Sequence, residues 1–133
     1  MKKALFYLSL TIIASALIIA CSIEDDDNPV TCEFVFQDLQ DLKIAIEDYA
    51  STSICSDEFE CRYIPFGSKP CGGPWTYIIY TTSIDTLELQ TIVTDYIERE
   101  NDYNLNCGAT SDCSVPIPPT GFTCEDNLCI PTF

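Results

Sequence analysis

The chain has 133 residues, a length that favours one compact domain, and it is strongly acidic, with 21 Asp and Glu against 6 Lys and Arg and a formal net charge of −15. It contains no histidine, which excludes Ser-His and Cys-His nucleophile pairs and the commonest zinc ligand. Binding to a phosphate backbone needs clustered Lys and Arg, so we expect no nucleic-acid partner. The nine cysteines are an odd number, which calls for an explanation.

The first twenty residues have the pattern of an export signal. Lys2 and Lys3 precede the uncharged, apolar run from Ala4 to Ala20, as in secretory signals. An uncleaved membrane-spanning helix is the alternative, although the run is short for a span. The run ends in Ile18-Ile19-Ala20-Cys21, which resembles the lipobox of bacterial lipoproteins. This resemblance implies cleavage after Ala20, attachment of diacylglycerol to the Cys21 thiol, and a membrane as partner.

We therefore expect three segments: a signal peptide over 1–20, an acidic flexible tether over 21–31 and a cystine-rich domain over 32–133. The acidic run 24–27 cannot pack a core, which predicts a spacer. It also resembles an acidic export signal of one phylum of Gram-negative bacteria, which implies an outer-membrane lipoprotein facing outside. A protein facing the periplasm is the alternative. After cleavage, 21 acidic residues oppose four basic ones, a formal charge of −17: Lys43, Arg62, Lys69 and Arg99.

Lipidation of Cys21 leaves an even number of cysteines, which predicts four disulfides in an oxidising compartment. The eight are Cys32, Cys55, Cys61, Cys71, Cys107, Cys113, Cys124 and Cys129. Their spacings lack the short C-x2-C pair of structural zinc sites, so we expect no metal and no cofactor. The pairing stays open. Cys124 and Cys129 would either bridge a terminal hairpin or each join it to the Cys61–Cys71 region.

The first half of the domain predicts a helix followed by two strands. Apolar residues at alternating spacings of four and three predict an amphipathic helix over 33–50. Segments 61–66 and 75–82 are rich in aromatic and β-branched residues, which predicts strands. Pro65 places the first strand at an edge or a bulge.

The second half predicts another helix and a hairpin. Asp85 and Glu88 have capping-box spacing, which predicts a helix over 85–100. The segment 101–108 contains Asn and Gly and is interpreted as a turn. Two β-prone arms flank Asp126-Asn127, which predicts a hairpin. The fold expected is α+β, with two amphipathic helices packed on a small antiparallel sheet and stapled by disulfides.

The most distinctive segment is Cys61–Tyr77. Its core, Phe66-Gly67-Ser68-Lys69-Pro70-Cys71-Gly72-Gly73-Pro74, resembles a segment of small exported bacterial proteins without assigned function, so the resemblance implies no activity. One interpretation is scaffolding, with turns formed by Gly and Pro and with Trp75 in the core. The other is a preorganised recognition loop, as in disulfide-bonded protease inhibitors, with Arg62, Lys69 and Trp75 as binding residues.

We expect a membrane-anchored, non-catalytic binding module with an unknown protein partner. A protease-inhibitor-like binder that uses the 62–75 loop is one alternative. A small hydrolase is another, because glycosidases use paired carboxylates and Asp57, Glu58 and Glu60 lie close in sequence. In a chain this acidic such neighbours arise by chance, so no catalytic residue is assigned.

Overall fold

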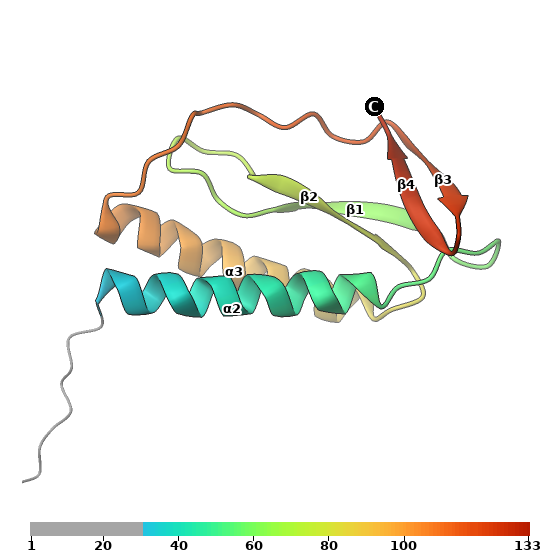
Figure 1. Ribbon diagram of the computed structural model, residues 1–133, viewed down its shortest axis with the longest axis horizontal. Coiled ribbons are helices and arrows are strands. Elements are labelled where there is room, and N and C mark those ends of the chain that lie inside the picture. Colours follow the sequence, from blue (N-terminus) through green and yellow to red (C-terminus); the bar gives the residue numbers. More distant parts are fainter. Residues whose placement is uncertain (1–30) are drawn as a thin grey trace, which may run out of the picture.

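The computed structural model describes residues 31–133 (Figure 1). The predicted signal peptide, Cys21 and the predicted tether up to residue 30 lie outside the described residues. The elements are α2 (Cys32–Ser51), β1 (Cys61–Phe66), β2 (Thr76–Thr81), α3 (Thr86–Cys107), β3 (Gly121–Glu125) and β4 (Leu128–Thr132). The strands form two separate antiparallel sheets, β1–β2 and β3–β4. The α+β prediction is confirmed, with the detail that the terminal hairpin forms a sheet of its own.

Helix α2 begins and ends within one residue of its predicted bounds. Thr31 caps its start, because the Thr31 side chain accepts a hydrogen bond from the Phe34 amide at 3.3 Å. The predicted apolar stripe supplies the buried Leu39 and Ile46. Among residues 31–133, no helix is both long enough and apolar enough to cross a membrane.

Helix α3 begins as predicted but continues seven residues beyond its predicted end. Asp85 caps it by accepting hydrogen bonds from two backbone amides, those of Leu87 and Glu88, both at 3.0 Å. The predicted turn over 101–108 was wrong, because tertiary contacts outweigh the weak helix propensity of its Asn residues. Asn104 Nδ2 donates to the Ser68 carbonyl at 2.7 Å. The helix ends only at Gly108, whose φ of 65° is left-handed.

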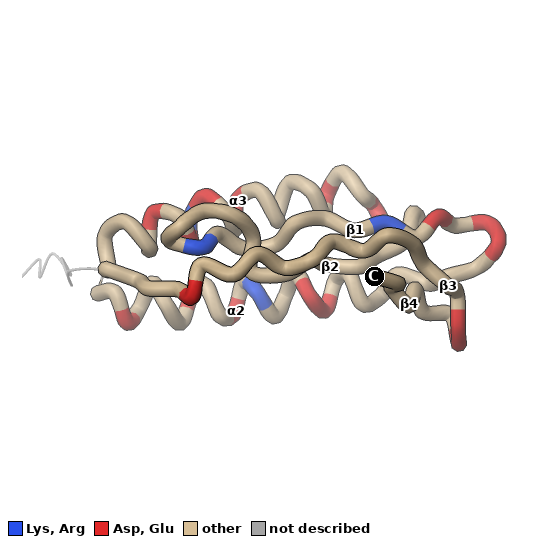
Figure 2. Tube along the Cα trace, turned by 90° about the horizontal axis from the view of Figure 1, so that it is seen from above, with Lys and Arg blue, Asp and Glu red and all other residues tan. Residues whose placement is uncertain are grey.

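The two helices lie side by side and antiparallel below β1–β2, and the extended segment 109–120 runs over the other side of that sheet (Figures 1 and 2). β1 and β2 pair from Cys61↔Thr81 to Phe66↔Thr76. Pro65 lies in β1, which is an edge strand as predicted. Between helices and sheet lies the core: Leu39, Ile46, Ala50, Phe66, Ile78, Tyr80, Leu89, Val93 and Tyr96.

The β3–β4 hairpin stands apart from this core. None of its strand residues is buried, whereas β1 and β2 both supply core side chains. Asp126 and Asn127 form its turn with φ of 52° and 64°. Both residues tolerate the left-handed region, as a two-residue type I′ turn requires. The hairpin is joined to the domain by two disulfides and by surface contacts, such as that of Phe122 with Tyr63 of β1 at 6.3 Å between ring centres.

The disulfides decide between the predicted pairings. They join Cys32 to Cys107, Cys55 to Cys124, Cys61 to Cys129 and Cys71 to Cys113. The local Cys124–Cys129 bridge is therefore wrong for this structure. The other predicted pairing, to the Cys61–Cys71 region, is confirmed for Cys129, which bonds Cys61. Cys124 instead bonds Cys55, which precedes that region in the sequence. The hairpin is thus fixed to the start of β1 and to the loop that precedes this strand.

Candidate functional site

The loop between β1 and β2, residues 67–75, has a buried base formed by Lys69. The Lys69 side chain is only 5% exposed, and its ammonium donates to Asp112 Oδ1 at 3.0 Å and to Ser114 Oγ at 3.1 Å. It also donates to the Ser114 carbonyl and lies 4.9 Å from the centre of the Trp75 ring. Because buried ammonium groups need partners, these contacts fix the loop to segment 109–120.

The same loop is also joined to helix α3. The Glu100 carboxylate accepts hydrogen bonds from the Ser68 amide and from the Tyr96 hydroxyl, the latter at 3.1 Å. Burial raises the pKa of Glu100 above its ordinary value, and these hydrogen bonds oppose that shift. Gly67 fits here because it has a φ of 83° and because an added Cβ would meet Trp75 Cδ1 at 2.5 Å.

In contrast to this base, the apex of the loop is exposed. Residues 70–73 are all exposed, and Cys71 within them is bonded to Cys113. The Lys69 amide donates to the Gly73 carbonyl at 2.9 Å, and the Gly72 amide donates to the Lys69 carbonyl at 2.8 Å. The apex is therefore a tight, exposed turn, tied by the Cys71–Cys113 disulfide and set on a base that Lys69 and Glu100 hold.

The three residues predicted to bind a partner do not form one site. Lys69 and Trp75 lie together at the base of the loop, where the ammonium of Lys69 faces the Trp75 ring. Trp75 is 40% exposed, so it is not the core residue that the scaffold interpretation predicted. Arg62 lies toward the opposite end of β1, where its guanidinium contacts Glu60 Oε2 at 2.6 Å. The exposed apex, which carries neither cation, is the free part of the loop.

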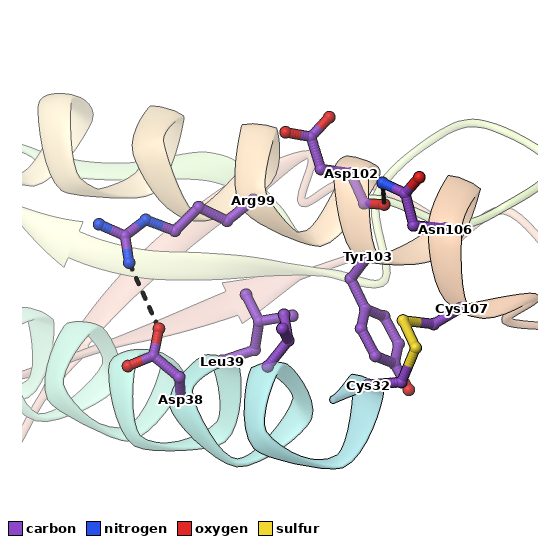
Figure 3. Close-up of a pocket in the computed structure, with 9 residues that line it drawn as sticks. Cys32, Asp38, Leu39, Arg99, Asp102, Tyr103, Asn106 and Cys107 are labelled. Carbon is purple, nitrogen blue, oxygen red and sulfur yellow. Dashed lines mark hydrogen bonds and ion pairs between the residues drawn. A yellow bond between two sulfur atoms is a disulfide. The ribbon is translucent and has the colours of Figure 1, made fainter. Parts of the chain in front are cut away.

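Apart from this loop, a hollow of about 490 Å³ lies between the start of α2 and the end of α3 (Figure 3). This volume is within the range of small-molecule sites, roughly 300–1,000 Å³. Its apolar wall includes Leu39 and the half-buried Tyr103, and the Cys32–Cys107 disulfide lies at one end (Figure 3).

Charged groups line the mouth of this hollow. Arg99 on α3 contacts Asp38 Oδ2 on α2 at 3.3 Å and Asp95 Oδ2 at 2.9 Å. All of these side chains are about half exposed, so the pairs are worth at most about 1 kcal/mol and open readily. No local pattern in the sequence indicates this hollow, because Asp38 and Arg99 are 61 positions apart.

The carboxylates considered for a hydrolase, Asp57, Glu58 and Glu60, lie on an exposed loop beside Arg62. Each of the four Lys and Arg residues of the described chain is in an ion pair with a carboxylate. The many remaining carboxylates are spread over both helices and the loops (Figure 2). The surface of residues 31–133 is therefore anionic with its cations already neutralised.

Comparisons with protein-family models, with curated proteins and with solved structures found no match to this chain.

Proposed function

We propose that this chain is an exported lipoprotein, anchored to the outer membrane through acylated Cys21 and facing outside, whose domain is a non-catalytic binding module. The observation that carries the anchoring is the pairing of all eight cysteines of residues 31–133 with one another. No cysteine of the domain is left for Cys21. Four disulfides also fit an oxidising compartment, which is where an exported chain resides.

Metabolic labelling with an alkyne analogue of palmitate, followed by membrane fractionation, tests the anchor. The full chain is expected to take up the label and to sediment with outer membranes. A Cys21→Ala variant is expected to lose the label, and a Cys32→Ala variant is expected to keep it. An unlabelled wild-type chain, or a Cys21→Ala chain that still sediments with membranes, would contradict the proposal. Protease treatment of intact cells then distinguishes an outward-facing domain, which is cleaved, from a periplasm-facing one, which is not.

For the binding role, we propose the exposed apex of the 67–75 loop as the contact element. Its support is that the turn at 70–73 is exposed to solvent and yet fixed, by the Cys71–Cys113 disulfide within it and by Lys69 and Glu100 at its base. A turn that is ordered before binding loses little conformational entropy when a partner docks. Disulfide-bonded protease inhibitors use the same device, so a protease is the alternative partner.

Site-specific photocrosslinking on intact cells tests this contact. A photoreactive residue at the exposed Pro70 is expected to give a discrete adduct, whereas one at the exposed Gln90 on α3 is expected to give none. Equal crosslinking from both positions would contradict a role of the loop. The purified domain is also assayed against a panel of secreted proteases. Inhibition of one of them would support the inhibitor-like alternative, and no inhibition would favour a partner that is not a protease.

A further inference from the structure

Four cysteines form one compact cluster at the start of β1. The Cys55–Cys124 and Cys61–Cys129 disulfides lie against each other, with 3.6 Å between the Sγ atoms of Cys55 and Cys61. The sulfurs of Cys55, Cys61 and Cys129 all lie within 4.8 Å of one another. The sulfurs of Cys55, Cys61 and Cys129 therefore each have a bonded partner and a close second neighbour, and Cys124 joins them through its bond to Cys55.

Two other pairings of these four cysteines, Cys55 with Cys61 and Cys124 with Cys129, are compatible with the backbone. Ser56 and Phe59 form an antiparallel bridge that brings Cys55 and Cys61 together. Cys124 and Cys129 are direct partners in the β3–β4 register, one step from the two-residue turn. Such a pair is the non-hydrogen-bonded kind, with Cα atoms about 4.5 Å apart, which is within the range that a disulfide spans.

Exposure differs across the Cys55–Cys124 bond. Cys124 is exposed, whereas Cys55 is only 4% exposed. An external thiolate must reach a sulfur to attack it, so it meets Cys124 first. The thiolate released by that attack is Cys55, which is buried beside the Cys61 sulfur.

We propose that Cys124 is a thiolation site at which a small or protein thiol triggers exchange of the two disulfides to Cys55–Cys61 and Cys124–Cys129. The external thiolate bonds Cys124 and releases the Cys55 thiolate. Cys55 then attacks Cys61, which forms Cys55–Cys61 and releases the Cys129 thiolate. Cys129 attacks the mixed disulfide on Cys124, which forms Cys124–Cys129 and expels the thiol. Two disulfides are present before and after, so no oxidant or reductant is consumed and the thiol is regenerated.

The exchange would change how the hairpin is attached. Both bonds that join β3–β4 to the rest of the domain would become local, one within the hairpin and one before β1. None of the hairpin's strand residues lies in the core. One backbone hydrogen bond, from the Cys55 amide to the Asn127 carbonyl at 2.8 Å, helps to hold its turn in place. The exchanged hairpin would then be held by segment 109–120, by this hydrogen bond and by side-chain contacts such as that of Phe122 with Tyr63, whose ring centres lie 6.3 Å apart. We therefore expect the exchange to loosen the hairpin.

Disulfide mapping of the full chain tests this exchange. The protein is incubated without oxygen with substoichiometric reduced glutathione, blocked with maleimide and digested after glutamate. Cleavage at Glu58 or Glu60 separates Cys55 from Cys61, and cleavage at Glu125 separates Cys124 from Cys129. We expect the original two linkages to fall together and the exchanged two to rise in equal molar amount. The Cys32–Cys107 and Cys71–Cys113 linkages are expected to stay constant, as all four are in a thiol-free control.

Two results would overturn the proposal. One is an unchanged map after glutathione, and the other is scrambling that includes Cys32 or Cys71. A Cys124→Ala/Cys129→Ala variant gives an independent measurement, because Cys55 and Cys61 are then expected to oxidise to each other and to resist maleimide. If both thiols of that variant stay reactive with maleimide under air while its helical circular dichroism is normal, the two sulfurs do not pair and the exchange fails.

Discussion

The 67–75 loop and the β3–β4 hairpin are both exposed turns tied down by disulfides, but they are held in different ways. The loop inserts a buried lysine into the fold, hydrogen-bonds to α3 through Glu100 and has one disulfide. The hairpin has two disulfides, while none of its strand residues is buried. The loop is thus fixed by a buried ion pair, hydrogen bonds and one disulfide, and the hairpin by two disulfides and contacts at the surface, such as that of Phe122 with Tyr63. The two should therefore respond to different perturbations.

Removing both hairpin disulfides should have the largest effect. A variant with alanine at Cys55, Cys61, Cys124 and Cys129 is expected to lose about 4 kcal/mol or more of unfolding free energy, at ~2–4 kcal/mol for each bond. Hydrogen exchange should lose protection in β3–β4 while α2 and α3 keep theirs, because the core lies between the helices and β1–β2. Matched removal of Cys32–Cys107 should leave the hairpin protected. A hairpin still protected in the first variant would show that non-covalent contacts hold it.

Lys69→Met should affect the loop and spare the hairpin. Methionine keeps the apolar stem but leaves the Asp112 and Ser114 oxygens without the ammonium. We expect a loss of about 1–3 kcal/mol in unfolding free energy, measured by denaturant titration. The exposed Lys43, paired with Glu47 at 4.0 Å, is the matched control, and Lys43→Met should cost no more than about 0.5 kcal/mol. Equal costs would mean that burial of Lys69 adds nothing.

Acid should loosen the loop through Asp112. Hydrogen bonding to Lys69 and Ser114 lowers the pKa of Asp112 to about 2 from its ordinary 3.8. A lowered pKa contributes stability that is present above 3.8 and is lost as the pH falls toward about 2. The Asp112→Asn variant should show a shallower decline of stability over that range, by an amount that is small because Asp112 is exposed. A carboxyl NMR titration with an ordinary midpoint would contradict the assignment.

Glu100 affects the pH dependence of stability in the opposite direction to Asp112. Its pKa is raised by burial, so its contribution is present below the ordinary value of 4.5 and is lost as the pH rises through the raised pKa. In stability measured against pH, Glu100→Gln should remove a decline on the alkaline side of 4.5, whereas Asp112→Asn acts on the acid side. A Glu100→Gln profile that parallels the wild type would contradict this.

Backbone changes at the two turns should have small effects of opposite sign. Gly72→Ala at the loop apex places a side chain at φ 90°, where its Cβ meets no atom within 4 Å. Only backbone strain remains, so we expect a loss of about 1 kcal/mol. Asn127→Gly in the hairpin turn relieves a φ of 64° and should be neutral or stabilising by a few tenths of a kcal/mol. Thermal denaturation of both variants measures the contrast, and a costly Asn127→Gly would point to a role of its side chain.

Periodicity and turn chemistry predicted most of the fold, because those signals are local. Helix α2, strand β1 and the hairpin turn at Asp126-Asn127 lie where the sequence placed them. The last seven residues of α3 were missed because Asn104 is stabilised by a contact with Ser68, 36 positions away. Such contacts leave no trace in a window of neighbouring residues.

The candidate site was predicted less well for the same reason. Lysine is almost never buried unless it is paired, and the partner of Lys69 lies 43 positions later, so its burial had no local sign. The pairing of Cys55 with Cys124 likewise depends on how the hairpin returns to β1. The run of Gly, Pro and Cys indicated an unusual loop, but such a local pattern does not show which of the loop's residues face solvent.

The positions of two disulfides have a mechanical consequence. The segment before Thr31 enters the domain at Cys32, which is bonded to Cys107, and only residues 108–112 separate Cys107 from Cys113, which is bonded to Cys71 at the loop apex. A pull applied between the apex and the N-terminal segment therefore travels along this short covalent path. The helices, the strands and the hairpin lie outside this path and bear none of the force. We therefore expect the domain to stay folded while it is pulled.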